Sequence, residues 1–566
     1  MKGYEFIAET MKKYDVTSVF YMESMFENVI RELKKKGVKA VLAHSENAAG
    51  YMADGYARAS QKPGVCIAQS IGAANMVGGI YDATLANSPV IAITGKKQAN
   101  LQYTGAYQET DHKLLFEGIT KLNVDMNDVS HTPFLLRRLF KDAVTGKPGP
   151  VHWDIPNNCG ITTEFADINE DIIVQEEYKS YPAVRPAVSD SGKLSEAASA
   201  IFEAKKPLLV VGRGAIVSGA GKELYKLAQK ADIPIVTTPD GKTIVDESDP
   251  LWAGIIGAYG MSCANVVATN ADLVIFVGTQ ASDQTTMGWS TPPKAVKSIQ
   301  IDIDPRELGM KYPHAIGLCG DVKVVLKQLL REVKATSKSA WRKEVSKHVN
   351  KTLAEYKALQ TAKGQAISPA RLCAEISQAL PKDAILFADT GNSAIWGSTM
   401  IRMKATQKFY RAAGSLGWSF PAALGGKCAL PDKPIYCFCG DGAFYYHMAE
   451  METAVRNGIN TVTIINNNRG LVQVRELLDI VYKDEPFESK EAGYRFSDID
   501  LSKVAEAMGC WSKRVTDAND ILPAIREAEK AGRPAIIEVI TSDDYTPNPC
   551  VDGPRPLYGF ASAGLK

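Results

Sequence analysis

The sequence predicts an α/β protein built from three successive doubly wound parallel-sheet domains. Short apolar runs bounded by turn residues recur along the chain, among them VCIAQ at 65–69, KPLLVVGRGAI at 206–216 and IYCFCGDG at 435–442. Helix-like segments separate these runs, a pattern typical of parallel strands joined by crossover helices. A chain of 566 residues is also too long for one hydrophobic core.

Changes in composition indicate where the domains begin and end. We expect an N-terminal domain at 1–160 and a central nucleotide-like domain at 189–340, joined by a charged, proline-bearing linker at 161–188. A helical linker is expected at 341–365 and a third domain at 366–547. The tail at 548–566 is rich in glycine and proline, which favours a mobile arm or lid.

Composition restricts the classes of function. Lys and Arg number 65 against 64 Asp and Glu, a formal net charge of +1, and no basic tail or stripe is present. This balance argues against a nucleic-acid partner. The N-terminus carries charges throughout, and no stretch approaches about 18 consecutive apolar residues, so we expect neither a signal peptide nor a membrane span. The predicted location is the cytoplasm.

Polar residues follow two apolar runs of the third domain. Asp441 stands between Gly440 and Gly442 at the end of one run, and the next run ends in three asparagines at 466–468. Both turns would lie at the carboxyl edge of a parallel sheet, where open α/β sheets bind ligands. Oxygen ligands of this kind, shared with a phosphate, suit Mg²⁺. Glycines let the backbone approach a phosphate at a helix N-terminus.

These two motifs resemble the diphosphate and metal motif of thiamine-diphosphate enzymes, in particular those of the acetolactate-synthase type. In that family an Asp and an Asn about 27 residues apart bind the metal, and 468 − 441 = 27. The resemblance implies that Asp441, Asn468 and the Gly470 carbonyl bind Mg²⁺, with Asn467 as the alternative. It also implies that Gly440, Gly442 and Ala443 lie against the cofactor diphosphate.

The first domain resembles the part of the family that activates the cofactor. The segment AHSENAAGYMADGYARAS at 43–60 places Glu46 where the family has its activating glutamate. A carboxylic acid there stabilises the imino tautomer of the aminopyrimidine, which then removes the thiazolium proton. Gln108, in AYQETDH at 106–112, matches a glutamine that hydrogen-bonds the substrate-derived oxygen. His44 and His112 are interpreted as structural rather than as proton carriers.

Two further segments of the third domain match the family. They are ADTGNSAIW at 388–396 and AAGSLGWSFPAALGGK at 412–427. The resemblance implies that the Gly414 carbonyl accepts the aminopyrimidine N–H and that Leu416 wedges between the cofactor rings. It further implies that the diphosphate is approached by Gly391, Asn392 and Ser393.

The resemblance also bears on assembly and on a second cofactor. In this family the glutamate and the metal motif meet across a subunit boundary, which implies a homodimer or homotetramer. The central domain, with GRG at 212–214 and IDIDP at 301–305, resembles the domain that binds FAD in acetolactate synthases. However, GTQASDQTTMGW at 278–289 lacks the Arg-Phe-Asp-Asp-type segment of flavin-binding relatives, so FAD is left open.

The expected reaction is carbon–carbon bond cleavage and formation on a 2-oxo acid or 1,2-diketone. Carboligation of the acetolactate-synthase type ranks first, simple decarboxylation second and cyclic diketone hydrolysis third. LVQVRELLDIVY at 471–482 lacks the tryptophan usual in acetolactate synthases, and GDGAFYYH at 440–447 resembles cyclohexane-1,2-dione hydrolase. Tyr445, Tyr446 and His447 either pack in the core or shape an unusual pocket.

Two rival hypotheses come from other classes. One is a catalytically silent binding or regulatory subunit, which the presence of Glu46 and Asp441 disfavours. The other is a nucleotide-binding oxidoreductase, for which VVGRGAIVSG at 210–219 lacks the full Gly-x-Gly-x-x-Gly spacing.

Overall fold

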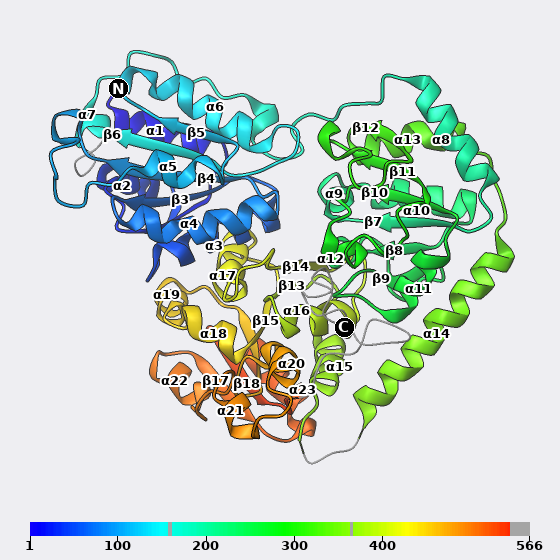
Figure 1. The fold of residues 1–566 in the computed structure, drawn as a ribbon. Helices are drawn as coiled ribbons and strands as arrows, with labels where there is room; N and C mark the ends of the chain where they lie inside the picture. The colour runs from blue at the N-terminus through cyan, green and yellow to red at the C-terminus, as the bar shows by residue number, and fades with distance from the viewer. Residues whose placement is uncertain (157–160, 363–365, 544–566) are drawn as a thin grey trace.

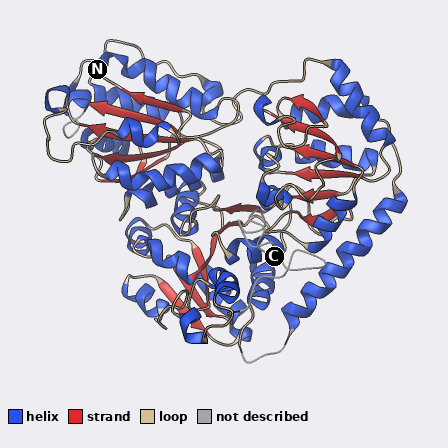
Figure 2. Cartoon of the chain, in the orientation of Figure 1, coloured by secondary structure: helices blue, strands red, loops and turns tan. Residues whose placement is uncertain are grey.

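A computed structural model describes residues 1–156, 161–362 and 366–543. The described chain forms three six-stranded sheets, each flanked by helices (Figures 1 and 2). Every strand pair in the three sheets is parallel. The predicted fold class is therefore confirmed, while the predicted tail at 548–566 lies outside the described residues.

The first sheet has the strand order β2-β1-β3-β4-β6-β5. Its strands are β1 (Ser18–Met22), β2 (Lys39–Leu42), β3 (Gly64–Gln69), β4 (Val90–Lys96), β5 (Leu122–Asp125) and β6 (Val151–Pro156). Its helices are α1 (Gly3–Lys13), α2 (Glu27–Lys35), α3 (Glu46–Ser60), α4 (Gly72–Leu85), α5 (His112–Glu117), α6 (Thr132–Val144) and α7 (Ile161–Phe165). Ile168, Tyr178 and Tyr181, from the segment expected as a linker, pack into the core of this domain.

The central sheet has the order β12-β11-β10-β7-β8-β9, the arrangement of dinucleotide-binding folds. Its strands are β7 (Pro207–Val211), β8 (Ile235–Thr237), β9 (Trp252–Ile255), β10 (Leu273–Val277), β11 (Lys297–Asp302) and β12 (Ala315–Cys319). Its helices are α8 (Ser191–Glu203), α9 (Arg213–Val217), α10 (Gly221–Ala231), α11 (Ser262–Asn270), α12 (Asp283–Thr286) and α13 (Val322–Glu332). The long helix α14 (Ser339–Thr361) then runs along the edge of the molecule toward the third domain (Figure 1).

The third sheet has the order β14-β13-β15-β16-β18-β17. Its strands are β13 (Ile385–Ala388), β14 (Lys408–Arg411), β15 (Ile435–Gly440), β16 (Val462–Asn467), β17 (Trp511–Val515) and β18 (Ala535–Ile540). Its helices are α15 (Pro369–Ala379), α16 (Asn392–Thr399), α17 (Ser419–Ala429), α18 (Asp441–His447), α19 (Glu450–Asn457), α20 (Val472–Val481), α21 (Phe487–Glu491), α22 (Leu501–Ala507) and α23 (Ile521–Lys530).

The first and third sheets share one topology, and this topology places the site. In the third sheet β13 lies between β14 and β15, so the connections leave β13 and β15 toward opposite sides. Ligands of open α/β sheets bind outside the carboxyl ends of the strands at such a switch point. Asp389 follows β13 and Gly440 ends β15, so the turns that begin at these two residues lie at the switch point.

The first and third domains contact each other through α3 and α17, which lie side by side (Figure 1). Two glycines permit this close approach. A Cβ on Gly55 would lie 2.0 Å from the backbone oxygen of Ala422, and a Cβ on Gly425 would lie 1.9 Å from that of Met52. Buried side chains from both domains form one shared core around these helices.

Candidate active site

Asp441 begins helix α18 directly after β15, at the switch point of the third sheet. Only 2% of the residue is exposed. Burial raises the pKa of Asp441 to about 7, although backbone N–H groups, including those of Gly470 and Asn468, oppose the shift. These two residues therefore lie beside the Asp441 carboxyl. A cation bound there would favour the carboxylate form.

The three asparagines after β16 have different surroundings. Asn466 accepts a hydrogen bond from the Thr541 hydroxyl at 2.7 Å. Asn467 uses both ends of its amide, donating to Glu538 at 2.7 Å and accepting from the backbone N–H of Arg469 at 3.0 Å. The Oδ1 atom of Asn468 is buried and has no hydrogen-bond partner within the described part of the chain. An unpaired buried acceptor of this kind suits a ligand.

The turn after Asn468 is held by a segment that sequence reasoning did not identify. Gly470 forms an isolated antiparallel bridge with Arg495. A Cβ on Gly470 would lie 2.3 Å from the Tyr494 backbone oxygen, so a side chain is excluded here. Arg495 also donates to the Asn468 carbonyl oxygen at 3.1 Å. No spacing or motif in the sequence identifies Arg495, because only the tertiary structure brings it next to Asn468 and Gly470.

The turn after β13 lies beside the turn after β15. Gly391 has φ +70°, a conformation that favours glycine, and it precedes α16. A Cβ on Gly440 would be 3.6 Å from the Ser393 hydroxyl, an ordinary van der Waals distance, so the two turns lie close together. The buried Oδ1 of Asn392 has no hydrogen-bond partner among the described residues. This edge thus presents unpaired polar atoms and bare backbone.

The loop that carries Gly414 and Leu416 is fixed by buried carboxylates. Asp389 accepts from the backbone N–H groups of Gly417 at 2.9 Å and Ser419 at 2.8 Å. Asp82, from α4 of the first domain, accepts from the N–H of Gly414 at 3.1 Å. Leu416 is partly buried against the core that the first and third domains share.

Glu46 is the first residue of α3, and Ser45 caps this helix by accepting from the Ala48 N–H at 3.1 Å. The Glu46 carboxylate accepts a hydrogen bond from Asn75 at 3.2 Å. A Cβ on Gly72 would lie 2.5 Å from Glu46 Oε1, so glycine leaves room for the carboxylate. Among the described residues of one chain, the hydrogen bonding of the Glu46 side chain stays within the first domain.

Gln108 lies in the loop between β4 and α5, half-exposed, with φ +58°. Its amide donates to the Tyr107 hydroxyl at 3.4 Å. The next residue, Glu109, accepts from the N–H groups of Gly105 and Ala106 at 3.1 and 3.3 Å, which closes the loop on itself. Within the described part of the chain, no hydrogen bond therefore joins the Gln108 side chain to Glu46 or to the third-domain turns.

The two histidines interpreted as structural both have carboxylate partners. His44 lies 2.8 Å from Glu452. His112 is buried and contacts Asp154 and the Ser70 carbonyl oxygen, each at 2.8 Å. Both histidines thus connect separate segments of the fold.

The aromatic segment after Asp441 has mixed surroundings. The Tyr445 ring packs edge-on against Phe496 with centroids 5.7 Å apart. His447 contacts the Gly417 carbonyl oxygen at 3.0 Å, and burial lowers its pKa. Tyr446 is 62% exposed. Of the three side chains, Tyr446 is the one free to meet another molecule.

Family models for thiamine pyrophosphate enzymes match the chain in three places. The N-terminal TPP binding domain matches residues 1–115, the central domain residues 194–329 and the C-terminal TPP binding domain residues 389–539. The chain belongs to the thiamine pyrophosphate enzyme family. The family resemblance drawn from the motifs is therefore confirmed, as are an enzyme and thiamine diphosphate as its cofactor.

Several similar proteins are acetolactate synthases. A probable acetolactate synthase large subunit of Methanocaldococcus jannaschii is 31% identical over 95% of this chain and 92% of its own length. The acetolactate synthase large subunit of Corynebacterium glutamicum is 32% identical over 90% of this chain and 81% of its own. Isozyme 1 of Escherichia coli is 30% identical, with 89% and 87% covered. Over the described ranges, no helix is long and apolar enough to cross a membrane.

Proposed function

We propose that this enzyme is a carboligase of the acetolactate-synthase type. It releases CO₂ from one 2-oxo acid and joins the remaining fragment to the carbonyl carbon of a second 2-oxo acid. The observation that carries the proposal is the position of Asp441 beside Asn468 at a switch point, where the buried Oδ1 of Asn468 has no hydrogen-bond partner among the described residues. The similarity to acetolactate synthases along most of the chain supports this reaction, and nothing in it favours a hydrolase or a silent subunit.

The residues at the third-sheet edge fit a magnesium diphosphate. In the proposal Asp441, the Asn468 amide oxygen and the Gly470 carbonyl bind Mg²⁺, which prefers oxygen ligands shared with phosphates. Within the described ranges, no cluster of three His, Cys, Asp or Glu side chains could hold a metal. The proposed ligands are instead one carboxylate, one amide oxygen and one backbone carbonyl oxygen. The diphosphate would be surrounded by Gly391, Asn392, Ser393, Gly440, Gly442 and Ala443.

When bound, thiamine diphosphate would supply a nucleophilic thiazolium carbon for chemistry at the substrate carbonyl group. In the proposal the Glu46 carboxyl shares a proton with the pyrimidine ring. The Gly414 carbonyl accepts from the amino group of this ring, and Leu416 packs between the two rings. Gln108 donates a hydrogen bond to the substrate oxygen on which charge develops.

The proposed enzyme is a homodimer or a larger assembly of dimers. Among the described residues of one chain, the Glu46 side chain hydrogen-bonds within its own first domain, and in the proposal a second chain brings its glutamate to the cofactor. Around this region the first domain exposes apolar and aromatic side chains. Ile71, which precedes Gly72, is 52% exposed, and Tyr107, which precedes Gln108, is 82% exposed. Surfaces of this kind are typical of protein interfaces.

The central cavity does not fit FAD well. A cavity of about 350 Å³ lies at the carboxyl edge of the central sheet. Helix α9, after Gly212, is only five residues long, and a Cβ on Gly212 would lie 2.5 Å from the Gly278 backbone oxygen. The glycines of the GRG motif are thus explained by close packing. Four aspartates and three cations line the cavity, namely Asp240, Asp283, Asp302, Asp321, Lys147, Arg213 and Arg411.

A diphosphate in this cavity would lie near four carboxylates and three cations, and each of these cations already donates to an acceptor. Arg411 donates to Asp240 at 2.9 Å, Lys147 donates to Glu307 at 3.1 Å, and Arg213 donates to the Ala86 carbonyl oxygen. Each cation therefore already has an acceptor. We expect thiamine diphosphate without flavin in the purified protein.

The test begins with mass spectrometry and absorbance of the purified protein, followed by incubation with thiamine diphosphate, Mg²⁺ and pyruvate. We expect CO₂ and acetolactate. Glu46→Gln should slow turnover by roughly two to four orders of magnitude, whereas Glu117→Gln, an exposed carboxylate at the end of α5, should not.

The outcomes separate the parts of the proposal. Full activity in Glu46→Gln would remove this glutamate from the mechanism. Cofactor binding without pyruvate turnover would contradict the proposed substrate and point to another 2-oxo acid or a diketone. No binding of thiamine diphosphate would overturn the proposal as a whole.

A further inference from the structure

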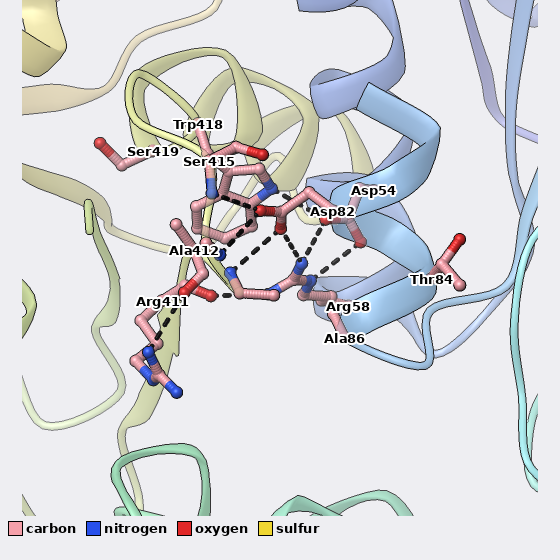
Figure 3. Close-up of polar contacts among 12 residues, drawn as sticks. Asp54, Arg58, Asp82, Thr84, Ala86, Arg411, Ala412, Ser415, Trp418 and Ser419 are labelled. Carbon is pink, nitrogen blue, oxygen red and sulfur yellow. Dashed lines mark hydrogen bonds and ion pairs between the residues drawn. The ribbon is translucent and has the colours of Figure 1, made fainter. Parts of the chain in front are cut away.

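A buried ion cluster joins the first and third domains beside the loop that carries Gly414. Arg58 of α3 is 3% exposed and lies between Asp54 and Asp82 (Figure 3). Its Nε donates to Asp54 Oδ1 at 2.9 Å, and its Nη2 donates to Asp82 Oδ1 at 3.0 Å. Its Nη1 donates to the Arg411 carbonyl oxygen at 2.7 Å, just before this loop. One cation thus serves two fully buried carboxylates.

The third domain supplies hydrogen-bond donors that stabilise the negative charge of Asp82. Asp82 accepts from three successive backbone N–H groups, those of Ala413 at 3.1 Å, Gly414 at 3.1 Å and Ser415 at 2.9 Å (Figure 3). Asp82 shares the Arg58 cation with Asp54, and three charge-assisted hydrogen bonds from backbone N–H groups further stabilise its carboxylate. The pattern is therefore specific for a carboxylate at position 82.

The other members of the cluster hold Arg58 in place. The Trp418 indole N–H donates to Asp54 at 2.8 Å, and the Arg58 guanidinium lies 4.3 Å from the Trp418 ring centroid. Burial alone would lower the pKa of Arg58, but the charges of Asp54 and Asp82 raise it overall. Arg58 therefore remains a cation.

We propose that Asp82 is a positioning residue for the cofactor: it fixes the peptide units of 413–415 so that the Gly414 carbonyl points at the aminopyrimidine. An N–H donated to Asp82 orients its own peptide plane, and the planes on either side of Gly414 are both tied to this carboxylate. Asp82 is fully buried, so in this proposal it acts through the loop and not by touching substrate or cofactor. This inference rests on the proposed function, in which Gly414 binds the aminopyrimidine.

The substitution Asp82→Asn tests this positioning role most directly. It keeps the shape of the side chain and leaves Arg58 paired with Asp54, so the buried charges balance and the protein should fold. Either orientation of the amide turns its NH₂ toward an N–H or guanidinium donor. The second variant, Asp82→Glu, keeps the charge but displaces it. The control is Glu164→Gln, which changes another buried carboxylate that accepts a backbone N–H, from Val29 at 2.9 Å.

Two measurements on the full-length proteins test the role. The first is amide hydrogen exchange of residues 413–415 without cofactor, which we expect to be at least about tenfold faster in Asp82→Asn. The second is the rate at which the thiazolium C2 proton exchanges with solvent at saturating thiamine diphosphate and Mg²⁺. We expect this rate to fall about tenfold to a hundredfold, because small misplacements of a catalytic geometry have effects of this size.

Glu164→Gln should change neither rate, and Asp82→Glu should fall between the parent and Asp82→Asn. Amide exchange at the parental rate in Asp82→Asn would overturn the proposal, as would faster amide exchange with an unchanged C2 proton rate. A parent protein that does not accelerate C2 proton exchange would overturn the proposed function and the cofactor role of Asp82 together. Amide exchange would then still show whether Asp82 holds the loop.

Discussion

At the residue scale, the three asparagines after β16 show how far a sequence motif can predict a metal ligand. The spacing from Asp441 favours Asn468, and the register leaves Asn467 as an alternative. Hydrogen bonding separates the two, because Asn467 is committed to Glu538 and Arg469 whereas Asn468 Oδ1 has no acceptor role among the described residues. The sequence could not supply this distinction, since Glu538 lies 71 positions away along the chain.

Asn468→Ala should therefore weaken Mg²⁺ binding, whereas Asn467→Ala should lower the stability of the fold. We expect Asn468→Ala to raise the Mg²⁺ concentration needed for cofactor binding by about tenfold to a hundredfold, with little change in thermal stability. Asn467→Ala should instead leave Glu538 underpaired and destabilise the fold by about 1–3 kcal/mol. Titration of Mg²⁺ at fixed thiamine diphosphate and thermal unfolding without cofactor would measure both. The reverse pattern would assign the metal to Asn467.

At the element scale, the most apolar strands were predictable and the order of the strands was not. Each apolar run quoted from the sequence contains a strand of one of the sheets, because a buried parallel strand needs apolar side chains on both faces. The order of strands depends on helices that cross between them and pack far from their own sequence. The same holds for the partners of Asp82, whose three N–H donors lie 331 to 333 residues further along the chain.

The contact between α3 and α17 makes a prediction about elements. In Gly55→Ala the added methyl would overlap the Ala422 backbone, so the two helices must separate. We expect a lower midpoint of thermal unfolding, with a cost of about 1–3 kcal/mol, as for other overpacked cores. The control is Gly118→Ala, because a Cβ on Gly118 has no neighbour within 4 Å. Equal unfolding midpoints for the two variants would contradict the proposed role of Gly55 in interdomain packing.

At the scale of the whole molecule, two halves of the proposed site belong to different domains. The third domain presents Asp441 and Asn468, while the first domain keeps the Glu46 side chain on Asn75. In the proposed dimer each cofactor would take its metal ligands from one chain and its glutamate from the other. This arrangement makes activity a property of the pair of chains rather than of one chain.

Complementation tests this arrangement directly. Glu46→Gln and Asp441→Ala chains, co-expressed with different affinity tags, would form three kinds of dimer. A mixed dimer purified through both tags has one site with both defects and one site with none. We expect such mixed dimers to regain about half of the parental activity per dimer, while each variant alone stays inactive. If one chain supplied both halves of its own site, every site in the mixed dimer would carry one defect. Mixed dimers as inactive as the single variants would therefore contradict a site shared between subunits.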